Sequence, residues 1–162
     1  ACALPPAPTT AGKMATDSPV ALTIPITTSI PSIANDAAEE PGIKELVENF
    51  GKRLQVVSLQ SPDAAQEMQK QYSEFVSPTL LEIWLNDVSK APGRMVSSPW
   101  PDRIEITTLS SKGSDRYEIT GFIVEITSTE VGAGKAAARK PIRLVVQKAQ
   151  GDWLITEYAE ER

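Results

Sequence analysis

The spacing of apolar residues changes once along this chain, near Ala91-Pro92-Gly93, and this change constrains the fold more than any other feature. Before it, apolar residues recur every three or four positions, as in amphipathic helices. After it, they recur at every second position, as in half-buried strands. Helices followed by strands predict an α+β domain in which the helices cover one face of an antiparallel sheet.

Three helices are expected before residue 91. The first is predicted to start at Glu39 and Glu40 with Pro41 in its first turn, because carboxylates and proline favour a helix N-terminus. Ser61-Pro62-Asp63 and Ser77-Pro78 are start signals of the second and third helices, in which serine caps and proline follows. The expected buried stripes are Ile43, Leu46, Val47, Phe50, Leu54 and Val57; Ala65, Met68, Tyr72, Phe75 and Val76; and Leu80, Leu81, Trp84, Leu85 and Val88.

Four strands joined by short turns are expected after residue 91, which predicts an antiparallel meander. In the second strand the apolar residues change parity at Gly121, which indicates a β-bulge in that strand. The four predicted strands are Arg103–Leu109, Arg116–Thr127, Pro141–Lys148 and Trp153–Tyr158. Between helices and sheet we expect a core of Phe50, Leu54, Tyr72, Trp84, Phe122, Val124, Leu144 and Trp153.

Residues 1–38 differ in composition from residues 39–162. Six of the 13 prolines fall before residue 35, together with many threonines and alanines. Such a chain buries too little apolar surface to offset the entropy lost on ordering, so it is predicted to be a tether to a single domain at 39–162. Val20, Leu22, Ile24 and Ile26 alternate as an edge strand would, which leaves open that this part packs on the domain.

Composition excludes several functions. The net charge is −5 and the pI about 4.8, which argues against nucleic acid as a partner. The chain has no histidine and one cysteine, so histidine-based triads and His/Cys zinc sites are excluded, and no cofactor or metal is expected. The Glu160-Glu161 pair is interpreted as a solvated terminus. No apolar run reaches the length of a membrane-spanning helix.

Cys2, directly before the Pro/Thr-rich tether, is a candidate lipid-attachment site. Ala1-Cys2 looks like the end of a lipobox, in which the cysteine becomes diacylated, and an acylated cysteine would anchor the protein to a membrane surface. The alternative interpretation is an arbitrary chain boundary.

The glycine-rich segment Gly132–Ala137 matches the dinucleotide pattern G-x-G-x-x-A only superficially. That motif needs a strand before it and a helix after it, whereas here Pro141 and a strand follow. We therefore expect a hairpin loop.

The same hairpin carries a basic run without an acidic residue. It is a candidate contact for an anionic surface through four residues: Lys135, Arg139, Lys140 and Arg143. Alternatively, these side chains form ion pairs with Glu118, Glu125 or Glu130.

The segment Ser97–Arg103 holds Trp100 between two prolines. A rigidly presented indole is a good stacking surface for a ligand, so the predicted binding rim is Arg94, Trp100, Asp102 and Arg103. In the alternative interpretation, Trp100 closes one end of the fold and Asp102–Arg103 is a structural ion pair.

The order of elements over residues 39–160, the predicted bulge at Gly121 and the closing Gly151–Ile155 strand together resemble the nuclear transport factor 2-like (cystatin-like cone) superfamily. More narrowly, Ala91–Arg94 and Ser97–Ile106 resemble runs in uncharacterised extracytoplasmic lipoproteins of Gram-positive bacteria. These resemblances imply a cone-shaped sheet and a membrane-anchored location at a Gram-positive cell surface.

The sequence favours the first of three functions, and the other two are alternatives. The first is a non-catalytic domain that binds a protein or a cell-envelope component. The second is a small-molecule-binding or isomerase-like enzyme, since some members of the superfamily pair an aspartate base with a tyrosine. Its candidate groups would be Tyr72, Tyr117 or Tyr158 with Asp102 or Glu157. The third is a structural spacer or a homodimer formed through the sheet, which an exposed apolar sheet face would indicate.

Overall fold

The computed structural model describes residues 6–9, 12 and 33–161, and the chain divides into two units, residues 1–30 and 31–162. The predictions for Cys2 and for the alternation at residues 20–26 lie outside the described residues.

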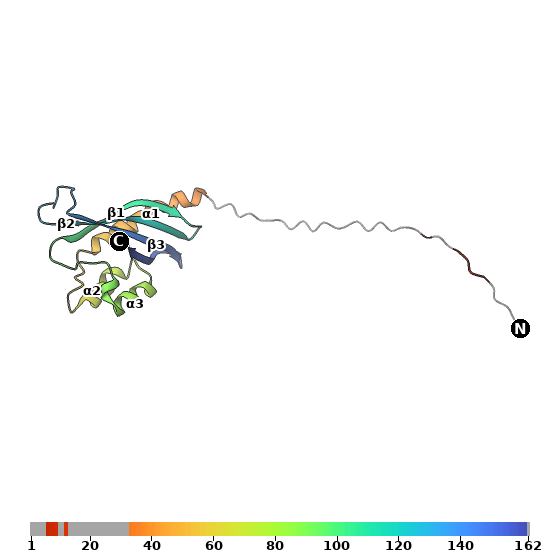
Figure 1. Ribbon diagram of the computed structural model, residues 1–162, viewed down its shortest axis with the longest axis horizontal. Helices are drawn as coiled ribbons and strands as arrows, with labels where there is room; N and C mark the ends of the chain where they lie inside the picture. The colour runs from red at the N-terminus through yellow and green to blue at the C-terminus, as the bar shows by residue number, and fades with distance from the viewer. Residues whose placement is uncertain (1–5, 10–11, 13–32, 162) are drawn as a thin grey trace. The chain divides into compact units, whose positions relative to one another are not determined.

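The second unit is an α+β fold of helices followed by one sheet (Figure 1). The four strands pair antiparallel in the order β1-β2-β3-β4, so the order in the sheet is the order in the chain. The predicted fold class, three helices on a four-stranded antiparallel sheet, is confirmed. The elements are α1 (Ile33–Arg53), α2 (Ala64–Tyr72), α3 (Pro78–Asn86), the 3-10 turn η1 (Val88–Lys90), β1 (Trp100–Ser111), β2 (Arg116–Ile126), β3 (Ala138–Ala149) and β4 (Asp152–Glu160).

Helix α1 begins earlier than expected. It starts at Ile33, so Pro41 lies inside the helix and not in its first turn, which corrects the sequence-based prediction. A tertiary contact holds this part of the helix. Glu39 accepts hydrogen bonds from the Lys148 ammonium at 2.7 Å and from the Trp153 indole, both on the β3–β4 hairpin. Packing of this kind routinely overrides local propensity.

The other two helices follow their local signals. Ser77 caps α3, and its hydroxyl accepts the Leu80 N–H at 3.3 Å while Pro78 occupies the first helical position. Helix α2 starts at Ala64, after the predicted Ser61-Pro62-Asp63 signal, but Pro62 lies outside the helix and the N-cap residue Asp63 makes no side-chain capping bond. The serine-cap prediction is therefore confirmed for α3, and for α2 the signal gives only the approximate start.

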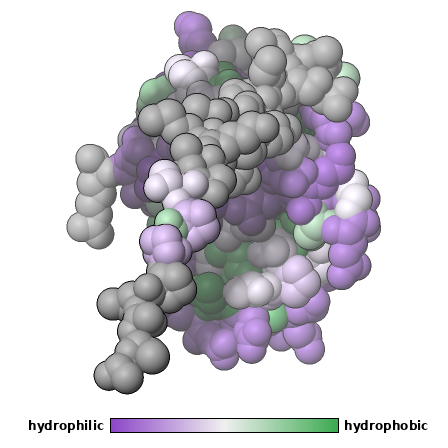
Figure 2. All heavy atoms as spheres, turned by 90° about the vertical axis from the view of Figure 1, so that its right-hand side faces the viewer, coloured by the Kyte–Doolittle hydropathy of each residue, from purple (hydrophilic) through white to green (hydrophobic). Residues whose placement is uncertain are grey.

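All three helices pack on one face of the sheet, which we call the inner face; Ile104, Ile119, Leu144 and Ile155 point toward it. The opposite side is the outer face. On the inner face the Phe50 ring lies 5.1 Å from Tyr72 and 6.3 Å from Trp84, which forms an aromatic centre to the core. The end view in Figure 2 shows mainly hydrophilic residues over the described surface, with a smaller hydrophobic area in its lower half.

Most of the predicted core is buried, with two exceptions. Phe122 and Trp153 are only partly buried, and Val124 is buried but lies outside the main core cluster. The cause is which residues of β2 face the helices. Tyr117, Ile119 and Ile123 all belong to the inner face, so the strand keeps one parity through Gly121 and places its neighbours Phe122 and Val124 on the outer face.

The bulge predicted at Gly121 lies in the neighbouring strand instead. Pairing of β1 with β2 shifts between Ile106 and Thr108, directly beside Gly121, whose own pairing with β3 is regular. A Cβ on Gly121 would lie 2.3 Å from the Glu105 carbonyl oxygen. Glycine is required here because the bulged strand β1 comes so close. The prediction of a bulge in β2 was therefore wrong, because the glycine marks a bulge in the neighbouring strand.

Candidate functional site

A groove of about 820 Å³ lies beside β4, at the end of the sheet where β4 ends and β3 begins. Thr156–Glu161 form one wall and Arg139–Pro141 extend it onto β3. Helix α3 and η1 form the other wall through Leu80, Ile83, Trp84, Ser89 and Lys90. We call this the β4 groove. Its size falls within the range usual for ligand sites, and its lining mixes apolar and polar side chains, as such sites do.

A bulge in β4 brings its polar side chains into the groove. Pairing of β3 with β4 shifts between Val145 and Val146, which leaves Thr156 as the extra residue. Trp153 and Ile155 lie on the inner face before the shift, and Tyr158 and Glu160 lie on it afterwards, opposite Leu144 and Ile142. Without that extra residue, the alternation of a strand would turn Glu157 and Ala159 inward instead.

Tyr158 forms the floor of the groove together with Trp84. Their rings meet edge to face with centroids 5.8 Å apart, and the Tyr158 hydroxyl donates to the Glu160 carboxylate at 2.7 Å. Burial raises the pKa of Tyr158, and the hydrogen bond to Glu160 raises it further. The phenol therefore stays protonated and acts as a hydrogen-bond donor at physiological pH.

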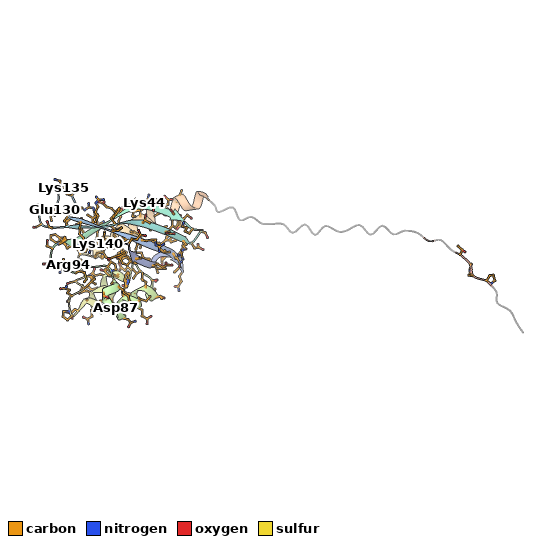
Figure 3. All side chains as sticks on the ribbon, in the orientation of Figure 1. Lys44, Asp87, Arg94, Glu130, Lys135 and Lys140 are labelled. Atoms are coloured by element: carbon orange, nitrogen blue, oxygen red, sulfur yellow. The ribbon has the colours of Figure 1, made fainter. Side chains whose placement is uncertain are left out.

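The cationic side chains around the groove each contact a carboxylate. Lys140 lies 2.7 Å from Glu125, which is 7% exposed. Arg139 lies 2.9 Å from Glu105 and Lys90 lies 3.2 Å from Asp87. Figure 3 shows Lys140 in the layer of the sheet and Asp87 in the layer of α2 and α3.

The predicted rim residues lie elsewhere. The Arg94 backbone is held by hydrogen bonds to Val57 and Leu59, and Trp100 is the first residue of β1, opposite Ile126. Asp102 and Arg103 form an ion pair at 2.7 Å, as in the alternative interpretation. None of these four residues lines the β4 groove. They lie toward the β1 edge at the same end of the sheet, so their ligand role stays a prediction.

Three of the four residues proposed to contact an anionic surface form ion pairs within the domain. Lys140 and Arg139 pair as described above, and Arg143 lies 3.6 Å from Glu118. Lys135 lies near Glu130 in the loop between β2 and β3 (Figure 3). The pKa of Glu130 is lowered, first because Thr127 hydrogen-bonds its carboxylate and least by the charge of Lys135. The pairing alternative therefore describes most of this basic run.

The glycine-rich segment is a hairpin loop, as predicted. Gly132 and Gly134 have φ of +73° and +64°, which favours glycine, and strand β3 follows with no helix. Within residues 33–161 no cluster of three or more acidic side chains is arranged to hold a metal ion. None of the described helices is both long enough and apolar enough to cross a membrane.

Of the three tyrosines considered for acid–base chemistry, only Tyr158 lies in the groove. Tyr72 is buried, where its hydroxyl donates to the Pro92 carbonyl at 2.8 Å, and Tyr117 is fully buried. The sequence reasoning missed the apolar wall of the groove. One signal was available, because Ile83 is apolar but lies off the stripe of Leu80, Leu81 and Trp84 that faces the core.

No family model and no curated protein matches this chain. The solved structures that resemble it include the following two. A designed NTF2-like protein has a TM-score of 0.38 and 14% identity, covering 79% of this chain and 99% of its own. The intermembrane space region of the chloroplast protein ARC6 has a TM-score of 0.43 and 18% identity, covering 80% of this chain and 98% of its own. An NTF2-like protein is thus among the structural neighbours, while the α+β fold itself rests on the strand order and helix packing described above.

Proposed function

We propose that this chain is a non-catalytic binding domain of the cell envelope, and that its partner, a protein or an envelope component, is held in the β4 groove. The observation that carries the proposal is an exposed apolar side chain on the wall opposite β4. Ile83 is 47% exposed on α3 and stands beside the buried Trp84. An apolar side chain at the mouth of a cavity with an aromatic floor is a typical anchor point for a partner.

The cations and the tyrosine around the groove support binding over catalysis. Lys90, Arg139 and Lys140 each form an ion pair, and Tyr158 is a neutral donor to Glu160. A general base or nucleophile needs a group free to accept or donate a proton at the working pH. Engaged side chains of this kind orient a bound partner instead.

Photo-crosslinking tests the location of the binding site. A benzophenone amino acid is placed at Ile83 or, as a matched control, at Val56, which is 48% exposed and lies outside the groove. The full chain is irradiated with an envelope extract of the cells that produce it. We expect one dominant adduct from position 83 and none from position 56. Equal labelling from both positions would contradict the proposal.

The envelope location in this proposal rests on Cys2 and on the likeness to extracytoplasmic lipoproteins. The gene's full product, expressed in its own host, should partition into detergent with a lipid mass increment on Cys2. The Cys2→Ala protein should move to the soluble fraction. Wild-type protein that is wholly soluble and unmodified would end this part of the proposal.

An isomerase-like or other small-molecule enzyme is the second candidate, and the Tyr158–Glu160 hydrogen bond favours it. A protonated tyrosine paired with a carboxylate in a cavity can donate a hydrogen bond to a substrate oxygen. Tyr158→Phe keeps the ring and removes the hydroxyl. If a turnover activity is found that Tyr158→Phe abolishes while partner binding persists, the domain is an enzyme.

A further inference from the structure

Strand β4 is an edge strand of the sheet, and a segment of the same chain already pairs with part of its free edge. The residues before α3 form a parallel bridge there, between Val76 and Ile155. The Ile155 N–H donates to the Phe75 carbonyl at 2.8 Å, and its carbonyl accepts from the Ser77 N–H at 2.8 Å. Helix α3 begins at Pro78, so this segment turns away and the rest of the β4 edge lies beside the groove.

The pairing of β4 with β3 determines which backbone groups face the groove. Glu161 N–H donates to the Pro141 carbonyl at 2.8 Å, across the pair formed by Glu160 and Ile142. In an antiparallel ladder such flanking bonds mark a pair that is not itself hydrogen-bonded, so the N–H and C=O of Glu160 point away from β3. Tyr158, two residues earlier, shares this orientation. Within residues 33–161, no turn, loop or bridge hydrogen bond engages the backbone of either residue.

The groove lining agrees with an open backbone edge. Every residue from Thr156 to Glu161 lines it, although the side chains of these residues alternate between the two faces of the sheet. A wall made by consecutive residues is a wall of main chain. The facing wall carries Leu80, Ile83 and Trp84, of which Ile83 is exposed, so it can receive an apolar side chain on one face of an added strand.

The charges along this edge favour a basic occupant. The cations around the groove pair with Asp87, Glu105 and Glu125, and Glu157 pairs with Arg116 at 3.1 Å. Among the described residues, the Glu160 carboxylate is hydrogen-bonded only by the neutral Tyr158 hydroxyl, and Glu161 has no ion pair. The wall therefore keeps an excess of negative charge beside an apolar surface.

We propose that the β4 groove binds an extended basic peptide, which adds to β4 as a further strand and continues the pairing begun by Phe75–Ser77. This inference rests on the proposed function and specifies the partner of the same groove. Main-chain hydrogen bonds to Tyr158 and Glu160 would supply affinity, and the pockets for alternate side chains would supply specificity. Apolar side chains of the peptide face Ile83 and Trp84, and a lysine or arginine lies near Glu160 and Glu161.

Synthetic peptides test the pairing directly. The probe is a labelled ten-residue peptide with alternating valine and polar residues, two of them lysine, measured by fluorescence anisotropy with the full chain. Two versions carry N-methyl groups on alternate amides, in opposite registers. We expect the parent and one methylated version to bind, because an added strand directs every second N–H toward β4. Equal binding of both methylated versions would overturn strand addition.

Two variants at one position separate backbone from charge. Glu160→Pro removes an outward N–H at an edge position that tolerates proline, and it should weaken peptide binding about tenfold. Glu160→Gln keeps the N–H and should weaken binding about two- to fivefold, with less salt dependence. Thermal unfolding of each variant confirms that the domain is folded. Peptide affinity unchanged in Glu160→Pro overturns the proposal.

The failures are distinguishable from one another. In one outcome, Glu160→Pro and both methylations leave peptide affinity unchanged, whereas Ile83→Asp abolishes binding and Val56→Asp does not. The groove is then the binding site, but strand addition is wrong. If neither the parent peptide nor envelope crosslinking depends on position 83, the proposed function fails as well. In another outcome, the wild type self-associates in a way that Glu160→Pro abolishes. This result would identify a second copy of this chain as the occupant of the groove and overturn the proposal of a basic peptide.

Discussion

Lys140 and Glu125 form an ion pair across β3 and β2, with 2.7 Å between the ammonium and a carboxylate that is almost fully buried. Lys140→Met should leave Glu125 without its partner and destabilise the domain by about 2 kcal/mol. The double variant Lys140→Met/Glu125→Leu should recover most of that loss, because no uncompensated charge remains. Urea denaturation of the four proteins of the cycle measures both effects. A neutral single variant would mean that solvent reaches Glu125.

Glu39 ties α1 to the β3–β4 hairpin and should make stability depend on pH. Its pKa is lowered from the ordinary 4.5, first by the Lys148 hydrogen bond and then by that of the Trp153 indole. A group whose pKa is lower in the folded state stabilises that state above its unfolded pKa. This contribution is lost as the pH falls through the folded value. Below pH 4.5 the stability difference between wild type and Glu39→Gln should therefore shrink. The neighbouring Glu40→Gln is the control, and chemical denaturation at several pH values is the measurement.

Gly121 and Gly42 should respond oppositely to alanine. A Cβ at Gly121 would meet the Glu105 carbonyl oxygen, so β1 must shift, and Gly121→Ala should destabilise the domain by about 2–3 kcal/mol. Gly42 lies inside α1 with nothing within 4 Å of its Cβ position, so Gly42→Ala should stabilise it by about 0.5–1 kcal/mol. Thermal and urea unfolding check both. A tolerated Gly121→Ala would mean that the bulge in β1 can be absorbed elsewhere.

Trp84 and Trp100 should differ in what their removal affects. Trp84 is 2% exposed and contacts Phe50, Tyr72 and Tyr158, so Trp84→Ala should lower stability by about 3–5 kcal/mol. Trp100 is only half-buried at the start of an edge strand, and Trp100→Ala should cost clearly less.

Partner binding measured alongside unfolding tests the predicted rim. A stable Trp100→Ala protein that no longer binds would extend the site from the β4 groove toward the β1 edge. A stable Trp100→Ala protein that binds its partner fully would show that Trp100 is not part of the binding site. The predicted rim of Arg94, Asp102 and Arg103 would then be wrong as well.

The fold was predictable from the sequence because its main signals are local. The change in apolar period near Ala91 gives the class, and a serine before a proline marks the start of α3 at Ser77. The start of α1 was not predictable, because Glu39 is held by two residues more than a hundred positions away. The sequence shows that Gly121 interrupts the apolar alternation of its strand. Only the pairing of the strands decides whether such a glycine lies in a bulge of its own strand or beside an adjacent strand that comes close.

The candidate site was less predictable than the fold, since it depends on the extra residue at Thr156. That residue turns Tyr158 and Glu160 inward, and nothing in the local sequence distinguishes it from a regular strand. The sequence predicts a site at the Trp100 segment because two prolines bracket the indole. A groove wall made of backbone leaves no such mark, because every residue type has the same N–H and C=O.

The sheet has the strand order of the chain, and this has a consequence for how the domain folds. Each strand meets the strand next to it in the chain, through short turns at residues 112–115 and 150–151 and a longer loop at residues 127–137, so the sheet can assemble stepwise without a search for distant segments. Helix α1 is different, because it is synthesised before β1 and the β3–β4 hairpin, which it contacts. During synthesis its apolar stripe therefore stays exposed until the sheet has formed.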